Sequence, residues 1–175
     1  MNLAIMTYLT KSMKFHEIEN SIQKEEMDYD DILRGNFEES FLNLTLKEKL
    51  WINWFTSFCQ SDFVFKGDDD IMVNPFMLQD LVSKIDPNQP SVYGSRLIHS
   101  PRIKNPRSKY FVDKSYWPED YYPDYVSGGG FIITNSTIFA IAKGKSFTDL
   151  IALPPTVYIA GFECFYSLIS GKRYF

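Results

Sequence analysis

The sequence is poor in cysteine and histidine, carries no excess of positive charge and contains no long hydrophobic run. Its two cysteines, Cys59 and Cys164, are too few for a disulfide-rich miniprotein or a cysteine-rich zinc site, and the sequence alone leaves their pairing open. The two histidines, His16 and His99, mean that any metal site must depend on carboxylates. Eighteen lysines and arginines against 22 acidic residues give a net charge of −4, so no nucleic-acid partner is expected.

What the sequence does have is apolar and aromatic residues, which make up 45% and 17% of 175 residues. This is enough for one domain with a buried core. Segments typical of strands alternate with segments typical of helices, which predicts an α/β layer fold. The apolar start, Leu3–Leu9, is expected to be a buried strand at the edge of the core, whereas the acidic residues 15–31 predict a surface helix and loop.

Two helices are predicted from capping patterns. Thr45 and Glu48 fit a capping box that opens a helix ending near Cys59, and Asn74 and Pro75 suit the cap and first position of another. The first helix has a wide apolar surface made of Leu46, Leu50 and Trp54, broadened by Trp51, Phe55 and Phe58. The second has one apolar face made of Leu78, Leu81, Val82 and Ile85.

The remaining elements follow the same alternation. Strands are predicted over residues 62–66, 91–96 and 131–134. Helices are predicted over residues 136–142, stopped by Gly144, and over residues 156–169. Between them, residues 96–114 form an irregular basic segment. The basic side chains of this segment would either help to bind a diphosphate or lie in a solvated loop. We expect a solvated loop.

Three consecutive aspartates, Asp68, Asp69 and Asp70, follow the first of these strands. Adjacent carboxylates repel one another, so a folded chain seldom keeps three together without a compensating cation. They lie at the carboxyl end of a strand, where open α/β sheets bind ligands, and their oxygens suit Mg²⁺ or Mn²⁺. The alternative is a solvated acidic turn before a helix, and position and spacing alone do not decide between the two.

A second group of residues combines glycines with aromatics. Ser127 is followed by Gly128, Gly129 and Gly130, which permit a close backbone approach. The aromatic residues upstream are Tyr116, Trp117, Tyr121, Tyr122 and Tyr125. Aromatic faces beside a glycine floor suit a sugar ring, whereas a tight turn packed under core aromatics is the alternative.

These pieces occur in an order that resembles glycosyltransferase family 31, the β-1,3-galactosyltransferase and N-acetylglucosaminyltransferase group. The segments that carry the resemblance are Asp31–Ser40, Asn43–Lys47, Phe63–Asn74, Pro101–Arg102, Lys109–Val112, Tyr122–Phe131 and Val157–Gly161. They resemble the family patterns D-I-L…D-F…D-S-Y, N-L-T-L-K, K-x-D-D-D-x-F-V-N, P-x-R, K-W-Y-V, Y-P-x-Y-x-S-G-G-G-Y and E-D-V-Y-x-x-G. The match is collinear over nearly the whole chain from Asp31.

The resemblance implies a GT-A-like fold, a mixed sheet flanked by helices, with residues 1–175 forming one glycosyltransferase domain that is truncated before its first strands and incomplete at both ends. It implies transfer of galactose or N-acetylglucosamine, with inversion, from a UDP-sugar donor to a glycan acceptor on a glycoprotein or glycolipid. It also implies a Golgi location, with a membrane contact only through an anchor that this chain lacks.

The site residues follow from the same resemblance. Mn²⁺ is expected on Asp70, with Asp68 nearby. Substrate contacts are expected from Lys66, Asp68, Asp69, Trp117, Tyr125, Ser127, Gly128, Gly129 and Gly130. The family's catalytic acidic position is occupied here by Thr156, which cannot accept a proton at neutral pH as a carboxylate does. Glu163 is the substitute base, although no spacing argument places it.

Three functions therefore remain open on the sequence. The chain is an active hexosyltransferase, a catalytically inactive relative that still binds metal with a UDP-sugar or a glycan, or a structural remnant without a ligand. Because losing a general base typically costs about 10²–10⁴-fold in rate, Thr156 is the residue that separates the first two.

Overall fold

The computed structural model describes residues 3–4, 7–11, 16–38, 43–122 and 124–143. In chain order the elements are β1 (Leu3–Ala4), β2 (Thr7–Lys11), α1 (His16–Tyr29), β3 (Ile32–Glu38), α2 (Leu44–Phe58), β4 (Phe63–Gly67), α3 (Pro75–Val82), β5 (Val92–Leu97), β6 (Tyr125–Thr134) and α4 (Asn135–Lys143). Strands and helices alternate, so the expected α/β class is confirmed.

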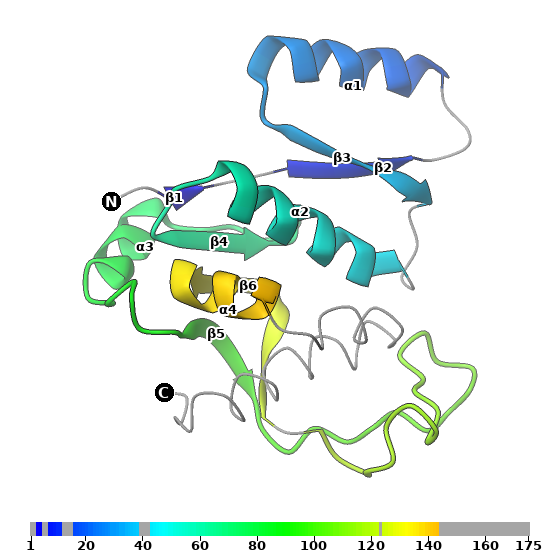
Figure 1. The fold of residues 1–175 in the computed structure, drawn as a ribbon. Helices are drawn as coiled ribbons and strands as arrows, with labels where there is room; N and C mark the ends of the chain where they lie inside the picture. Colours follow the sequence, from blue (N-terminus) through cyan, green and yellow to red (C-terminus); the bar gives the residue numbers. More distant parts are fainter. Residues whose placement is uncertain (1–2, 5–6, 12–15, 39–42, 123, 144–175) are drawn as a thin grey trace.

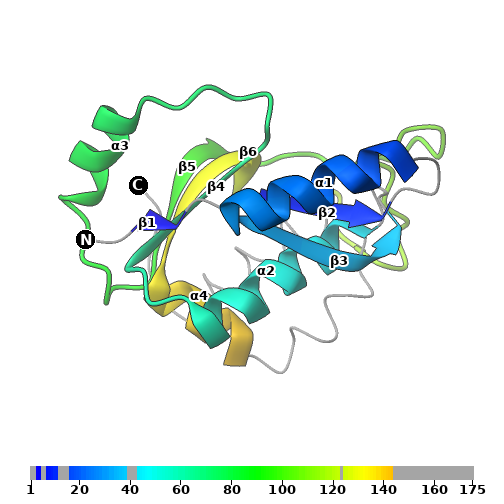
Figure 2. The same ribbon diagram turned by 90° about the horizontal axis from the view of Figure 1, so that it is seen from above.

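The main sheet has the strand order β1-β4-β6-β5. Strand β1 runs parallel to β4, whereas β4 and β5 both run antiparallel to β6. Helices α2 and α4 lie on one face of this sheet and α3 on the other (Figures 1 and 2). The apolar start contributes β1 at the sheet edge, while its continuation, β2, pairs with β3 in a separate two-stranded sheet beside α1.

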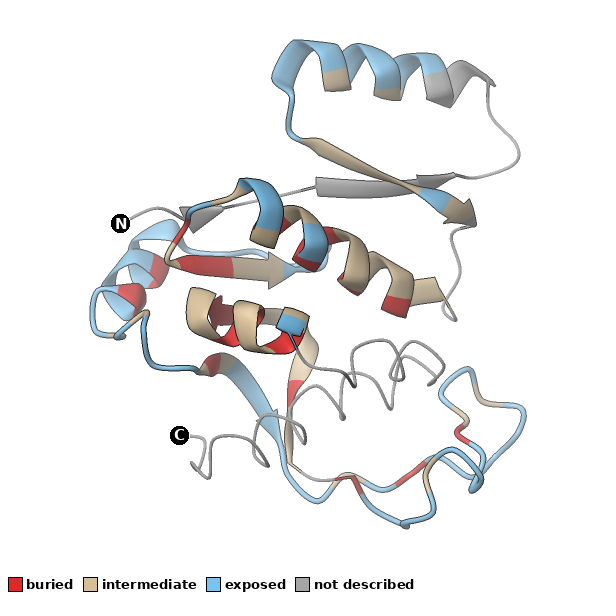
Figure 3. Cartoon of the chain, viewed as in Figure 1, coloured by how far each residue is buried: buried red, intermediate tan, exposed pale blue. Residues whose placement is uncertain are grey.

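Two hydrophobic cores form because successive side chains of a strand point to opposite faces. Val64 of β4 and Ile133 of β6 pack with α2 and α4, whereas their neighbours Phe63 and Ile132 pack with α3. The buried residues accordingly gather on the sides of α2 and α4 that face β4 and β6 (Figure 3). Helices therefore pack on both faces of the sheet where β4 begins and β6 ends.

Helix α2 confirms the predicted helix but not its capping box. The N-cap is Asn43, so Thr45 lies in the first turn, where it is buried and its hydroxyl makes no hydrogen bond. The core face contains Trp51 and Phe55 as expected, but Phe58 is 77% exposed. The helix is therefore rotated relative to the predicted stripe, because packing against β4 and α4 decides its buried face.

Helix α3 begins as the sequence predicts. The Asn74 side chain accepts the backbone N–H groups of Phe76 and Met77, at 3.0 and 3.3 Å, and Pro75 follows as the first helical residue. Leu78 and Val82 are buried against the sheet. The helix ends at Val82, so the expected face does not continue as helix to Ile85, which is half-buried; Leu81 is exposed.

Strand β6 is longer than predicted and contains the glycine triplet. The expected strand began at Phe131, but the ladder starts at Tyr125 and pairs Gly130 with Gly67 of β4. The glycines therefore form part of a strand rather than a tight turn. Gly94 of β5 shows why small residues are needed here, because a Cβ atom on it would lie 2.3 Å from Val126 Cγ1.

Several predictions fall outside the described residues. These are the helix over residues 156–169, the stop at Gly144, Cys164, and the two candidate catalytic positions Thr156 and Glu163. Cys59, which is described, is a free and half-buried thiol. Within the described part of the chain, no helix is long and apolar enough to span a bilayer.

Candidate functional site

The first of the three aspartates lies against residues 128–130 of β6, called the glycine strand below. Asp68 follows β4 directly, and its backbone N–H donates to the carbonyl of Gly129 at 3.0 Å. Its Oδ2 atom lies 3.9 Å from the point where a Cβ of Gly129 would stand. All three aspartates are exposed to solvent. The structure thus brings the acidic triplet next to the glycines, although the two are 58 residues or more apart along the chain.

The triplet does not form a closed metal site by itself. Over the described ranges, no group of three or more His, Cys, Asp or Glu side chains is arranged to hold a metal ion. Magnesium-type ions are usually held by one or two carboxylates, completed by waters and substrate phosphates. Exposed carboxylates beside a side-chain-free backbone fit such an open site, in which a phosphate supplies the missing oxygen ligands.

The glycine strand leaves room at Gly129, where the nearest atoms to an added Cβ lie 3.8 and 3.9 Å away, but not at Gly130. Gly128, Gly129 and Gly130 are half-buried, and a Cβ on Gly130 would lie 2.9 Å from Cδ1 of Ile71. Ser127 accepts the N–H of Gly129 through its hydroxyl at 3.5 Å. A bulkier residue at position 130 would therefore displace the segment that follows the acidic triplet.

Lys66 is held inside the protein rather than presented to solvent. Its side chain is 13% exposed, and its Nζ forms an ion pair with Glu48 of α2 at 3.2 Å. The same Nζ lies 3.5 Å from the Gly128 carbonyl and 5.5 Å from the centre of the Phe131 ring. Glu48 was expected only to cap its helix, so sequence reasoning missed it as a neighbour of the site. The available signal was a carboxylate on the same helical face as Trp51 and Ile52.

Three of the aromatic residues upstream of the glycines, Trp117, Tyr122 and Tyr125, form a small core with Val112, whereas Tyr116 and Tyr121 are exposed. Tyr122 and Val112 are buried, and Trp117 and Tyr125 pack on Tyr122 with ring centres 5.6 and 6.2 Å away. Burial raises the pKa of the Tyr122 hydroxyl, which makes no hydrogen bond. Trp117 donates its indole N–H to the Tyr121 carbonyl at 3.1 Å. Of the predicted substrate contacts, Trp117 and Tyr125 thus pack in the same cluster at the N-terminal end of β6.

Arg102 holds this segment in place. It is 7% exposed, and it donates from Nη1 to the Val112 carbonyl at 2.8 Å and from Nε to the Glu119 carbonyl at 3.1 Å. The expectation that the basic segment is wholly solvated is therefore wrong for Arg102. The segment loops out from the ends of β5 and β6 as an irregular chain (Figure 1).

Two acidic residues that follow the basic segment in sequence, Asp120 and Asp124, neutralise part of its positive charge. Asp120 pairs with Lys104 at 2.8 Å, and Asp124 pairs with Arg96 at 2.6 Å. The hydrogen bond and charge of Lys104 lower the pKa of Asp120, and the hydrogen bond from Arg96 lowers that of Asp124. These contacts place the cations in an internal network that orders the loop.

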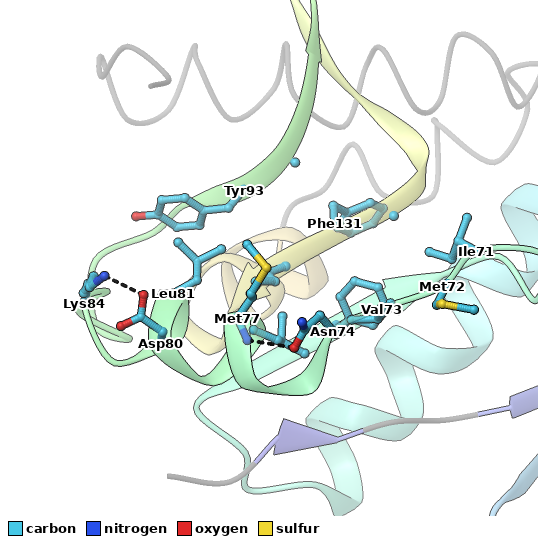
Figure 4. A pocket seen from close by; sticks show the side chains of 15 residues that line it. Ile71, Met72, Val73, Asn74, Met77, Asp80, Leu81, Lys84, Tyr93 and Phe131 are labelled. Carbon is cyan, nitrogen blue, oxygen red and sulfur yellow. Dashed lines mark hydrogen bonds and ion pairs between the residues drawn. The ribbon is translucent and has the colours of Figure 1, made fainter.

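An open apolar pocket of about 700 Å³ lies on the α3 side of the sheet (Figure 4). Met77 and Leu81 of α3 face Tyr93 of β5 across it, and Ile71 and Gly130 form its end nearest the acidic triplet. Asp68, Asp69 and Asp70 are not among its lining residues. The pocket and the acidic triplet are thus neighbouring features on either side of Ile71.

The fold and site define a mixed α/β protein in which an acidic triplet at a strand end adjoins a glycine strand. The family model described as Galactosyltransferase matches residues 9–162. The chain is 36% identical over 130 residues to human UDP-GlcNAc:betaGal beta-1,3-N-acetylglucosaminyltransferase 9, covering 74% of this chain and 32% of that protein. It is 38% identical over 109 residues to rat UDP-GlcNAc:betaGal beta-1,3-N-acetylglucosaminyltransferase 7, covering 62% and 28%.

A further relative is human beta-1,3-galactosyltransferase 5, with 32% identity over 133 residues, which covers 74% of this chain and 43% of that protein. The chain belongs to the galactosyltransferase family. It spans roughly a third of the length of the N-acetylglucosaminyltransferases that it matches, 32% and 28% in the two cases above. The match includes both the acidic triplet and the glycine strand, so the resemblance noted from the motifs is confirmed.

Proposed function

We propose that this chain is the donor-binding part of a β-1,3-hexosyltransferase with a GT-A-like sheet. It would take galactose or N-acetylglucosamine from a UDP-sugar and transfer it, with inversion, to a glycan on a glycoprotein or glycolipid. The observation that carries the proposal is the contact between Asp68 and Gly129, which joins the acidic triplet to the glycine strand. The names of the relatives support the β-1,3 linkage and the choice of sugars.

The residues of the triplet have distinct parts in this proposal. Asp70 would bind Mn²⁺, and Asp68 would contact the ion or the donor from the edge of the glycine strand. The ion, when bound, neutralises the leaving diphosphate as a Lewis acid. Gly129 leaves the space that a flat sugar or a diphosphate needs, since a Cβ atom built on it would meet nothing closer than 3.8 Å.

The acceptor hydroxyl must lose its proton on the opposite face of the sugar. The position that the family resemblance assigns to that base holds Thr156. Glu163, a carboxylate further along the sequence, is proposed to replace it. Thr156 also favours a second function, in which the chain binds Mn²⁺ with a UDP-sugar or glycan but does not turn it over. A Golgi location belongs to the same proposal and depends on the family resemblance.

Calorimetric titration with UDP in the presence of Mn²⁺ tests the proposed site. We expect the unmodified chain to bind and Asp70→Asn to lose Mn²⁺-dependent binding by at least about 100-fold, since changing even a hydrogen-bond partner of a metal ligand costs about 10–100-fold in metal affinity. Asp80→Asn, which removes another exposed carboxylate, from α3, is the matched control and should bind like the unmodified chain. A chain that binds neither Mn²⁺ nor UDP would be the structural remnant.

Turnover then separates the two binding functions. An active transferase releases UDP from UDP-galactose or UDP-N-acetylglucosamine when an acceptor glycan is added. Binding without release supports the inactive relative, and a Thr156→Asp variant that gains release would assign the loss to that position. Release that is unchanged in Asp70→Asn would contradict the metal site.

A further inference from the structure

A buried ion pair lies next to the acidic triplet. Glu48 of α2 and Lys66 of β4 are 12% and 13% exposed, and their charged atoms, Oε1 and Nζ, are 3.2 Å apart. The second carboxylate oxygen of Glu48 accepts the indole N–H of Trp51 at 2.5 Å. Both oxygens of Glu48 are therefore engaged, one by the ammonium group and one by a tryptophan that is itself 2% exposed.

Lys66 is close to the triplet in both sequence and space. In an extended strand, side chains two residues apart project to the same face, so Lys66 shares a face with Asp68. The Lys66 ammonium lies 3.5 Å from the Gly128 carbonyl, and the next residue of the same strand, Gly129, accepts the N–H of Asp68. An unpaired ammonium here would lie on the same stretch of the glycine strand as the Asp68 carboxylate, whose Oδ2 is 3.9 Å from the Cβ position of Gly129.

A buried ion pair seldom stabilises a fold more than apolar residues of the same volume would, because both charges lose their hydration. Its effect on the charge of the site is more specific. Glu48 neutralises Lys66 from the α2 side, so the Lys66 ammonium does not cancel the negative charge of Asp68. Removing Glu48 alone would leave a positive charge beside three exposed carboxylates.

We propose that Glu48 is a positioning residue of the donor site: it holds the Lys66 ammonium against Gly128 and away from Asp68, so that the aspartates stay available to a divalent cation. This inference rests on the proposed function. In this arrangement Lys66 orders the backbone of the glycine strand, and its own charge is already balanced before a ligand arrives.

Binding of Mn²⁺ alone, followed by the electron paramagnetic resonance signal of the free ion, tests this role. Glu48→Gln should weaken Mn²⁺ binding by about tenfold, since the freed ammonium competes for Asp68 at short range. The double variant Glu48→Gln, Lys66→Met should return to within about threefold of the unmodified chain, although it restores no hydrogen bond or charge. Glu48→Asp, which keeps the charge, should also stay within about threefold.

Control and alternative variants keep the test decisive. Asp80→Asn breaks the exposed pair between Asp80 and Lys84 and should leave Mn²⁺ binding unchanged. Tryptophan emission checks that each variant is folded around Trp51. If Glu48→Gln alone does not fold, Glu48→Met, which fills a similar volume without a charge, is used: Mn²⁺ binding weakened by about tenfold supports the proposal, and unchanged binding overturns it.

The outcomes also separate this inference from the proposed function. An unmodified chain that binds no Mn²⁺, with or without UDP, overturns the proposed function and this inference with it. An unmodified chain that binds Mn²⁺, together with a Glu48→Gln variant that binds equally well, overturns this inference alone. A purely structural role would lower the melting temperature of Glu48→Gln without the recovery of Mn²⁺ affinity in the double variant.

Discussion

Replacing Arg102 by methionine removes the guanidinium group that ties the 98–124 segment together but keeps its apolar stem. Two hydrogen bonds are lost, at 2.8 Å to the Val112 carbonyl and at 3.1 Å to the Glu119 carbonyl. A hydrogen bond from a charged donor contributes about 1.5–3 kcal/mol. Taking the lower end for each, since only the first is fully buried, the segment should lose about 3 kcal/mol of local stability.

Amide hydrogen exchange measures this loss residue by residue. Because about 1.4 kcal/mol corresponds to a factor of ten, exchange should accelerate by about 100-fold. The reporting amides are those of Val112, which donates to Ile103 at 3.2 Å, and Tyr122, which donates to Ser100 at 2.9 Å. Amides in the ladder between β4 and β6 should keep their rates, since that ladder lies outside the segment.

Lys104→Met is the matched control, because Lys104 pairs with Asp120 as Arg102 does but at the surface, where its side chain is 59% exposed. An exposed ion pair contributes about 0–1 kcal/mol, so exchange should change less than about fivefold. Equal acceleration in both variants, or none in Arg102→Met, would refute the assignment of local stability to the buried carbonyl contacts.

Three further predictions follow from single contacts. Asn74→Ala removes the cap of α3 and should lower the free energy of unfolding by about 1 kcal/mol, measured in urea. Gly94→Ala places a Cβ 2.3 Å from Val126 Cγ1 and should cost about 1–3 kcal/mol, with partial recovery when Val126 is also changed to alanine. Lys104 lowers the pKa of Asp120 below 3.8, so the charged Asp120 stabilises the folded state at higher pH. This stabilisation disappears as the pH falls through the folded-state pKa. Urea denaturation between about pH 5 and pH 3 should show this loss, and Lys104→Met should remove Asp120's part of it.

Elements with strong local signals could be predicted from the sequence. Asn74 and Pro75 mark the start of α3 because a side-chain acceptor and a fixed backbone angle act within one turn of helix. Strand β4 was predicted within one residue at each end, since its β-branched and aromatic residues are bounded by polar ones. The contact between Asp68 and Gly129 was not predicted from either segment; the family resemblance only assigned both segments to substrate binding.

The features that were missed depend on residues far apart in sequence. Thr45 and Glu48 match a capping box, yet the Glu48 carboxylate binds Trp51 and Lys66, and the latter lies on another element. The sequence does not show that β4 will pass beneath α2, so a local pattern was preferred. Arg102 was expected in solvent for the same reason, because the carbonyls that it binds come from positions 10 and 17 residues later.

Residues 98–124 leave the sheet at Leu97 and return at Tyr125, and these two residues face each other in adjacent strands. The cost of closing such a loop grows only slowly with its length. The excursion can therefore be lengthened, shortened or exchanged between relatives without redrawing the strand order, because its two attachment points remain neighbours. The pairing of β5 with β6 is thus set independently of the segment that carries Arg102 and Trp117.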